Sequence, residues 1–315
     1  MFFATTALAL LIERFVGYPD VIARTTAHPI QWIGAFIAWL DARLNPPGGP
    51  GSRLAGMAAL LVLLLMAGGL AMAVALVLRK LPYGWIAEAI IATPFLAQKS
   101  LHDHVRAVAD GLDRSLADGR SAVARIVGRD PDMLDRSGVA RAALESLGEN
   151  ASDGIVAPAF WLALLGLPGI VLYKAINTAD SMIGHKSPRY LAFGWASARL
   201  DDLVNLPSAR LTALLLAIAA LFSSRASAKA AFAAMVRDAH RHVSPNAGWP
   251  ESALAGALGI RLGGPRSYGG RHVELATMGD GRSDLEPGDI RAGLSLYGRA
   301  LSLLTGLVLL LALAS

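Results

Sequence analysis

The chain contains no cysteine among its 315 residues. This absence excludes structural disulfides, zinc sites built on thiolates and cysteine nucleophiles, and it leaves the redox compartment open. Charged residues are scarce as well, at 17% of the chain, whereas a soluble domain usually carries about 25%. Hydrophobic residues reach 54% and gather in long runs. The composition therefore predicts a membrane protein.

Several catalytic and binding motifs are also missing. The sequence has no Gly-x-Ser-x-Gly, no His-Glu-x-x-His and no dinucleotide-binding glycine fingerprint. Gly184, His185 and Lys186 resemble a nucleotide-binding P-loop only superficially, because the histidine separates the glycine from the lysine. The formal net charge is +5, but no basic block is interleaved with aromatic residues. The excess is therefore assigned to cytoplasmic loops and anionic lipid, and nucleic acid is excluded as a partner.

Long apolar runs predict a helical membrane protein. Residues 54–78 are 25 residues without a charge, enough to cross roughly 30 Å of hydrocarbon. A final span is expected over 298–314, and residues 28–44 have the spacing of an amphipathic interfacial helix. We therefore expect an all-α, polytopic fold with about four to six membrane segments, one of them a candidate re-entrant segment. The expected location is the cell inner membrane.

Two segments between the apolar runs have the composition of soluble protein. Residues 98–154 carry eight Lys and Arg, and residues 224–297 carry nine. Because positive charge is enriched in cytoplasmic loops, both are expected to be helical cytoplasmic loops within a single integral membrane domain, 1–315.

The run 155–176 is long enough to span, but Pro158, Gly166, Pro168 and Gly169 divide it into two halves. Two alternatives follow from these breaks. The run either crosses the membrane fully or forms a re-entrant pair of half-helices that returns to the same side.

Polar side chains are concentrated just before this run, in Glu-Ser-Leu-Gly-Glu-Asn-Ala-Ser-Asp-Gly at 145–154. A helix cap would explain one acidic residue here but not the whole group. The group consists of Glu145, Glu149, Asn150 and Asp153. Carboxylates beside hydrocarbon are costly unless they face a polar cavity or bind a cation. Oxygen ligands at this density suit a hard cation such as Mg²⁺ with phosphate ligands.

A second polar cluster follows the run, at 177–189. Asn177 and Asp180 are about one helical turn apart and so share a face. Lys186 and Arg189 follow as cations that can bind phosphate.

A third acidic cluster and a turn lie further along the chain. Asp201 and Asp202 precede another apolar run, and a helix N-terminus would account for only one of them. Asn246 and Glu251 lie in a turn-rich segment where Pro250 has an ordinary role at the start of a helix.

Taken in order, these motifs resemble those of the adenosylcobinamide-phosphate synthases, integral membrane proteins of cobalamin biosynthesis. The similarity covers nearly the whole chain. It is carried by His-Pro-Ile-Gln-Trp-Ile-Gly at 28–34, the cluster at 145–154, Asn-Thr-Ala-Asp-Ser-Met-Ile-Gly at 177–184, Asp-Asp-Leu-Val-Asn-Leu-Pro at 201–207 and Ser-Pro-Asn-Ala-Gly-Trp-Pro-Glu at 244–251. One departure is Gly-Tyr-Pro-Asp at 17–20, where the family has a Gly-Asp-Pro turn.

The resemblance implies an ATP-consuming carbon–nitrogen ligase. It would join adenosylcobyric acid to (R)-1-amino-2-propanol or its O-2-phosphate, giving adenosylcobinamide or its phosphate. An acyl phosphate is the simplest activated carboxylate, and it requires a metal-bridged γ-phosphoryl group held in line. ATP and Mg²⁺ are the expected cofactors. The expected partners are the two substrates, membrane lipid and other late cobalamin-assembly enzymes at the membrane.

Roles within the clusters follow as hypotheses. The expected metal ligands are Glu149, Asn150, Asp153 and Asp180, with Asp201 and Asp202 as further candidates. Phosphate or substrate would be bound by Lys186, Arg189, Arg210, Asn246 and Glu251. The expected catalytic residues are Glu149, Asp153, Asp180 and His185, since a carboxylate or this histidine would accept the amine proton. The first two clusters would form one shared site facing the cytoplasm, which requires the re-entrant form of 155–176.

Two other function classes stay open. A transporter of an anionic or corrinoid solute would also place polar groups beside a broken helix, and it would move solute without making an amide. A non-enzymatic membrane sensor or scaffold would neither use ATP nor move solute. Acidic clusters next to soluble loops, where a cytoplasmic nucleotide can reach them, favour the ligase.

Overall fold

The computed structural model describes residues 1–18, 28–46, 51–128, 131–264, 266–268, 271–273 and 275–315. The Gly-Tyr-Pro-Asp segment at 17–20 lies partly outside these residues. The chain divides into two compact units. Unit 1 contains residues 1–97, 157–205 and 307–315, and unit 2 contains residues 98–156 and 206–306. Both segments expected to be cytoplasmic loops therefore belong to unit 2.

The described part of unit 1 is helical. Its elements are α1 (Phe3–Phe15), α3 (Pro29–Leu44), α4 (Arg53–Leu78), α5 (Gly84–Ala92), η1 (Thr93–Phe95), α9 (Ala157–Leu165), α10 (Leu167–Ile183), α11 (Tyr190–Phe193) and α12 (Trp195–Val204). The core forms where α3, α4 and α10 meet around buried side chains such as Ile37, Leu63 and Phe193. The expected helix at 28–44 is confirmed, and His28 caps it ahead of Pro29.

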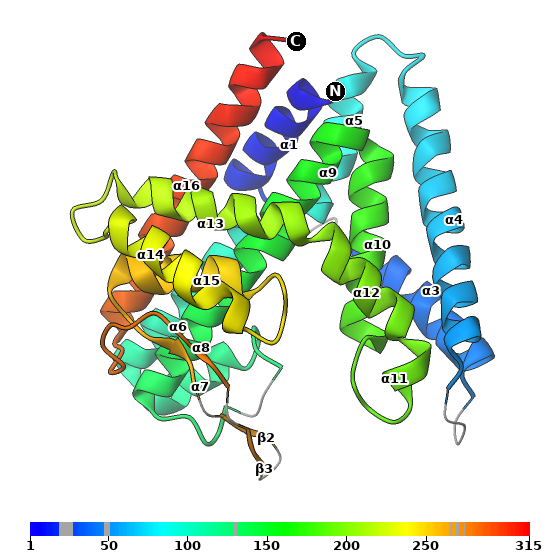
Figure 1. Cartoon of the computed structure of the whole chain (residues 1–315). Coiled ribbons are helices and arrows are strands. Elements are labelled where there is room, and N and C mark those ends of the chain that lie inside the picture. Colours follow the sequence, from blue (N-terminus) through cyan, green and yellow to red (C-terminus); the bar gives the residue numbers. More distant parts are fainter. Residues whose placement is uncertain (19–27, 47–50, 129–130, 265, 269–270, 274) are drawn as a thin grey trace. The chain divides into compact units, whose positions relative to one another are not determined.

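The segment 155–176 divides between α9 and α10 at Gly166, as its breaks predict. Gly166 has a φ of 69°, a left-handed conformation that glycine adopts without strain. The two helices pack against each other, so the chain doubles back within unit 1 (Figure 1). The position of this hairpin in a membrane stays a prediction.

The elements of unit 2 surround α8. They are α6 (Gln98–Arg114), α7 (Leu116–Val123), α8 (Arg136–Ala151), the π-helix η2 (Ser152–Val156), α13 (Leu206–Ala220), α14 (Ala228–Asp238), η3 (Ala239–Arg241), α15 (Gly248–Leu258), β1 (Leu262–Gly263), β2 (Arg266–Tyr268), β3 (Arg271–Val273), β4 (Thr277–Met278) and most of α16 (Pro287–Leu313). Helix α8 packs against α6, α7 and α15. Its side chains Ala140, Leu144 and Leu147 are buried.

The short strands correct the expectation of a purely α fold. Strand β1 pairs antiparallel with β4, opposing Leu262 to Met278, and β2 pairs antiparallel with β3. Gly259 ends α15 with a φ of 61°, and Gly263 and Gly264 also have positive φ. These left-handed residues interrupt any helical repeat, so the chain pairs as short strands instead. The fold is nearly all-α.

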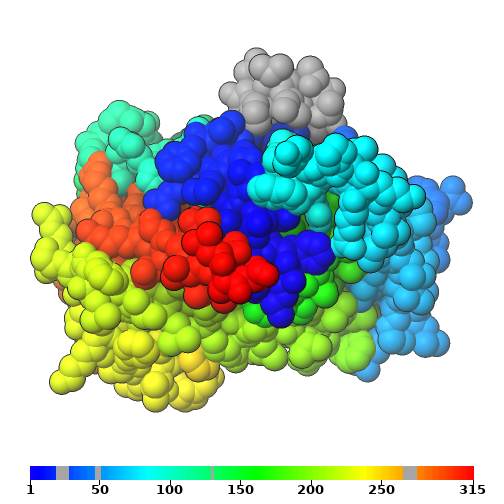
Figure 2. All heavy atoms as spheres, turned by 90° about the horizontal axis from the view of Figure 1, so that it is seen from above, coloured from blue at the N-terminus to red at the C-terminus, as the bar shows by residue number. Residues whose placement is uncertain are grey.

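Among the described residues, two helices are long and apolar enough to cross a membrane, namely α4 and α16. Helices α12 and α13 would form a third if taken as one broken span. The predicted span at 54–78 matches α4. The last expected span, 298–314, falls within α16, whose helix begins earlier, at Pro287. Figures 1 and 2 show the C-terminal end of α16 (red) beside α1 (blue), in line with its place in unit 1. The expected total of about four to six membrane segments stays a prediction.

Candidate functional site

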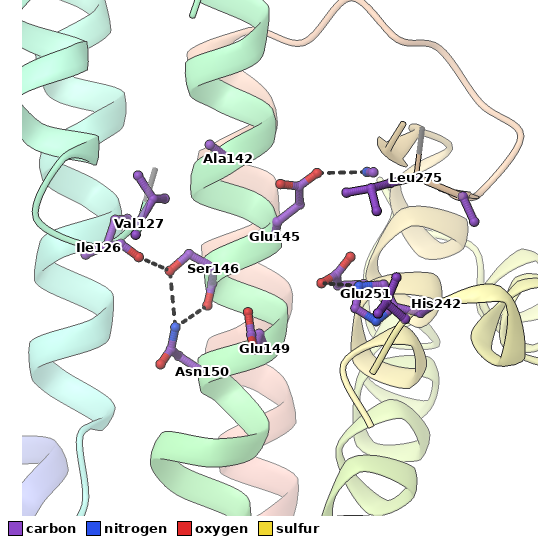
Figure 3. Close-up of a pocket in the computed structure, with 14 residues that line it drawn as sticks. Ile126, Val127, Ala142, Glu145, Ser146, Glu149, Asn150, His242, Glu251 and Leu275 are labelled. Atoms are coloured by element: carbon purple, nitrogen blue, oxygen red, sulfur yellow. Dashed lines mark hydrogen bonds and ion pairs between the residues drawn. The ribbon is translucent and has the colours of Figure 1, made fainter. Parts of the chain in front are cut away.

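Unit 2 contains a cavity of about 500 Å³ beside α8, lined by both polar and apolar residues (Figure 3). One helix face supplies much of its wall, because residues three or four positions apart along a helix lie close together. These residues are Glu145, Ser146, Glu149 and Asn150. Opposite them stand His242, which follows η3, and Glu251 of α15. The cavity thus gathers three carboxylates and a histidine.

Hydrogen bonds hold the α8 face in place. Glu145 is buried, and its Oε1 accepts a hydrogen bond from the Gly263 N–H at 2.8 Å, which ties β1 to α8. Ser146 Oγ donates to the Ile126 carbonyl at 2.9 Å, and Asn150 Nδ2 donates to the Ser146 carbonyl at 3.0 Å. Glu149 is exposed to solvent at this wall. Glu145 and Asn150 are therefore positioned by the fold, and Glu149 can meet a ligand.

His242 and Glu251 form a pair on the other wall. The Nε2 of His242 lies 3.8 Å from Oε1 of Glu251, and the Ser244 N–H donates to His242 Nδ1 at 3.0 Å. The same Nδ1 lies 3.3 Å from the Ser244 carbonyl oxygen, so Ser244 can hold the ring in either tautomer. In both cases Nε2 faces the Glu251 carboxylate. The pair therefore combines an imidazole and a carboxylate, both of which can exchange protons.

The structure also brings Arg210 and Asn246 together in unit 2. Arg210 Nη1 donates to the Asn246 side-chain oxygen at 3.1 Å and to the Leu206 carbonyl at 3.0 Å. The guanidinium lies 4.8 Å from the centre of the Trp249 ring, close enough for a cation–π interaction. These contacts hold the guanidinium in a fixed orientation, with its planar group available for an oxyanion.

In unit 1, α10 and α12 share a buried hydrogen-bond network. Asp201 accepts from Asn177 Nδ2 at 3.2 Å and from Asn205 Nδ2 at 3.0 Å. Tyr173 extends the network, because its hydroxyl donates to the Asn205 side-chain oxygen at 2.9 Å. The charge of Asp180 acts on Asp201. Of the predicted residues, this network brings together Asp180 and Asp201.

Lys174 is the main residue of this network that the sequence reading missed. It is buried at 8% exposure, and its Nζ lies 3.4 Å from the Asn177 side-chain oxygen. Burial lowers the pKa of His28, and the charge of Lys174 lowers it further. The run 155–176 has the length of a span and contains this lysine near its end. An ionisable residue within an apolar run is itself a sign of function, and that signal would have found it.

Other predicted residues of unit 1 have different surroundings. Arg189 forms an ion pair with Asp41 at 2.7 Å, and the Tyr190 hydroxyl donates to the same carboxylate oxygen at 3.1 Å. Burial raises the pKa of Tyr190, and its hydrogen bond to Asp41 adds to the rise. His185 and Lys186 are exposed, and the charge of Lys186 acts on Asp202.

No group of three or more His, Cys, Asp or Glu residues could hold a metal ion in the part of the chain that the structure describes. Of the predicted ligands, Glu149, Asn150 and Asp153 belong to unit 2, whereas Asp180, Asp201 and Asp202 belong to unit 1. A single shared site therefore stays a prediction. Carboxylate and amide oxygens still fit Mg²⁺ that arrives with a nucleotide, because this ion commonly uses one or two carboxylates together with phosphate oxygens and water.

Comparisons with known proteins extend these observations to the whole chain. A family model described as "CobD/Cbib protein" matches residues 6–297. The "Cobalamin biosynthesis protein CobD" of a Sinorhizobium species is 51% identical over 97% of this chain and 97% of its own length. Proteins of the same description from Rhodobacter capsulatus and Brucella suis are 50% and 49% identical, covering 98% and 96% of this chain and 98% and 94% of their own. No solved structure matches the chain.

Proposed function

The chain belongs to the CobD/Cbib family, and we propose on this basis that it is a membrane-bound enzyme of cobalamin biosynthesis. Its reaction would be the ATP-dependent ligation of adenosylcobyric acid with (R)-1-amino-2-propanol or its O-2-phosphate. The observation that carries the proposal is the similarity along nearly the full length to proteins described as CobD. Similarity limited to one shared domain would support the proposal less, because one fold can carry unrelated functions.

The reaction has two steps in this proposal. A carboxylate oxygen of adenosylcobyric acid attacks the γ-phosphorus of ATP, the bond to the β-phosphate oxygen breaks, and ADP leaves. The amine nitrogen then attacks the acyl carbon, the bond to the phosphate oxygen breaks, and inorganic phosphate leaves with the former carboxylate oxygen. The nitrogen gives up a proton to a base. The protein must therefore neutralise phosphate charge, orient two substrates and accept a proton.

The cavity of unit 2 suits the amine. Glu145, Glu149 and Glu251 surround it with negative charge, which favours an ammonium group over an anion. The amine must be neutral when it attacks, so a base has to stand within reach of it. We assign this role to Glu251, with His242 at 3.8 Å stabilising and orienting its carboxylate. Asn246 and Arg210 lie in the same unit as candidates for a phosphate of the substrate.

The network of unit 1 suits the nucleotide. Asp180 and Asp201 are the candidates for Mg²⁺, which would bridge phosphate oxygens and neutralise their charge when bound. Lys174 and Asn177 hold the Asp201 carboxylate through a chain of contacts. Lys186, which follows Asp180 closely in the sequence, is exposed and can bind a phosphate oxygen as a point charge.

Purified protein in detergent tests the proposal. It would be incubated with adenosylcobyric acid, aminopropanol phosphate, ATP and Mg²⁺, and mass spectrometry would look for the amide. The expected result is product that requires ATP, with aminopropanol run in parallel to identify the preferred amine. Uptake of a corrinoid into protein-containing vesicles without amide formation would favour a transporter instead.

Matched variants test the assignment of the base. Glu251→Gln keeps the shape of the side chain but removes its ability to accept a proton, so we expect kcat to fall about 100-fold. Glu286→Gln removes an exposed carboxylate elsewhere in unit 2 and serves as the charge control. Equal activity of the two variants would contradict the assignment.

A further inference from the structure

A second cavity in unit 2 is basic. It has a volume of about 240 Å³ and lies between the α13–α14 connection and α16. Three arginines line it, namely Arg225, Arg291 and Arg299, together with the serines Ser223, Ser224 and Ser295. Guanidinium and hydroxyl groups are the donors that proteins use to bind phosphoryl oxygens. No carboxylate is among its lining residues in the described part of the chain.

The positive charge of this cavity is only partly balanced. Arg291 forms ion pairs with Asp110 at 2.9 Å and with Asp113 at 2.5 Å, both on α6. No ion pair to Arg225 or Arg299 is found among the described residues. Arg225 is exposed on the connection, and Arg299 is half-buried on α16. Two guanidinium groups therefore remain to neutralise an anion.

The surroundings of the cavity are apolar and exposed. Leu221 and Phe222 directly precede its serines and are 68% and 65% exposed. Leu214 and Ile218 extend this exposed stripe along α13 at helical spacing. A cavity for a soluble anion has no need of such a border, because exposed apolar surface of this kind marks contact with an apolar partner.

Helix α16 lines the basic cavity and also contains an expected membrane span. It has the length and composition of a membrane span. Arg291 and Arg299 lie in its first half, before the uncharged run 300–313. Basic residues where a span enters the headgroup region are suited to anionic lipid, and basic pockets between helices bind lipid headgroups.

From this combination we infer that the basic cavity binds the phosphate of an anionic membrane phospholipid, with the acyl chains against the α13 stripe. Arg225 and Arg299 neutralise the headgroup, and the serine hydroxyls donate to its oxygens. The site is separate from the carboxylate-lined cavity on α8, with which it shares no lining residue among those described. Lipid binding at this site does not depend on the ligation reaction.

Native mass spectrometry of the detergent-purified protein tests the inference. Phosphatidylglycerol and phosphatidylcholine with identical acyl chains would be titrated in parallel, so that only the headgroup charge differs. We expect preferential binding of phosphatidylglycerol. The Arg225→Gln/Arg299→Gln variant should weaken it about 25-fold, since one basic residue near anionic lipid contributes about fivefold. Arg225→Lys/Arg299→Lys should retain the preference.

Controls separate the site from general charge and from folding. Arg136→Gln/Arg261→Gln removes the same charge from exposed positions of unit 2 and should leave lipid binding unchanged. If the double glutamine variant does not fold, Arg225→Gln alone changes only an exposed position and should cost about fivefold.

Three results would overturn the inference. They are equal binding of the two lipids, unchanged binding in the glutamine variants, and displacement of the lipid by millimolar inorganic phosphate. The last result would assign the cavity to a soluble phosphate.

Discussion

Glu88 carries the most specific stability prediction of the fold. It is a buried carboxylate on α5 at 2% exposure, and its Oε1 accepts a hydrogen bond from the Leu167 N–H at 2.8 Å. Gly166 precedes α10 and has no side chain with which to cap it. Pro168 has no N–H to satisfy. Glu88 thus replaces the missing cap from another helix and fixes the point at which α10 begins.

The magnitude follows from what each substitution leaves behind. Glu88→Ala removes the acceptor and leaves a buried N–H without a partner. The expected loss is therefore about 1–3 kcal/mol, a range that includes the typical cost of about 1 kcal/mol for a lost cap. Glu88→Gln keeps a carbonyl acceptor and loses only the charge beside the helix N-terminus, which is worth roughly 0.3–1 kcal/mol.

Thermal unfolding in detergent is the assay. At about 2 °C per kcal/mol for a chain of this size, Glu88→Ala should lower Tm by about 2–6 °C and Glu88→Gln by about 2 °C or less. The comparison matters more than either value. An alanine variant as stable as the wild type, or a glutamine variant as unstable as the alanine variant, would refute the cap.

The remaining predictions concern charge. Asp201→Asn loses one hydrogen-bond acceptor, which is destabilising, but it also removes a buried charge beside Asp180, which is stabilising. Tm should therefore change little, whereas kcat/KM of the ligation should fall about 100-fold. Lys174→Met should raise the pKa of His28, measured by NMR of labelled histidine, because the lysine charge contributes to its depression. Burial alone would raise the pKa of Asp238, but hydrogen bonds from Arg237 and the Gly279 N–H outweigh it and lower the pKa. The stability from this carboxylate is therefore present above its unfolded pKa of about 4 and is lost as pH falls through the lower folded value. Asp238→Asn should be less stable at pH 7 and should flatten the fall of Tm in acid.

Local pattern was sufficient for several helices. The uncharged run that became α4, the proline after His28 at the start of α3, and the break at Gly166 are all signals within a few neighbouring residues. Such signals act through hydrocarbon length, capping and backbone conformation. They need no knowledge of distant contacts, and the structure confirms them.

Other features depend on partners far along the chain. The cap of α10 joins residues 79 positions apart, and the bond from Gly263 to Glu145 joins residues 118 apart. No periodicity encodes either contact. Strand β1 was missed for the same reason, since two residues are too few for a period-two pattern. Lys174 was visible in the sequence but was read as part of an apolar run.

The polar clusters fall between these two cases. The density of carboxylates and amides in the sequence grouped Glu149 with Asn150, and the structure puts both on the wall of one cavity with Glu251. Their chemistry stays a proposal. Pairing a cluster of unit 2 with a cluster of unit 1 was a functional argument, because it came from the needs of phosphoryl transfer and not from any pattern in the chain.

Isotope transfer tests the central claim most directly. Adenosylcobyric acid labelled with ¹⁸O in the reacting carboxylate would be incubated with the purified protein, aminopropanol phosphate, ATP and Mg²⁺. An amide formed through an acyl phosphate transfers one labelled oxygen to inorganic phosphate for each product molecule, which mass spectrometry detects. Label in AMP would contradict the acyl phosphate, and the absence of an ATP-dependent amide would contradict the ligase itself.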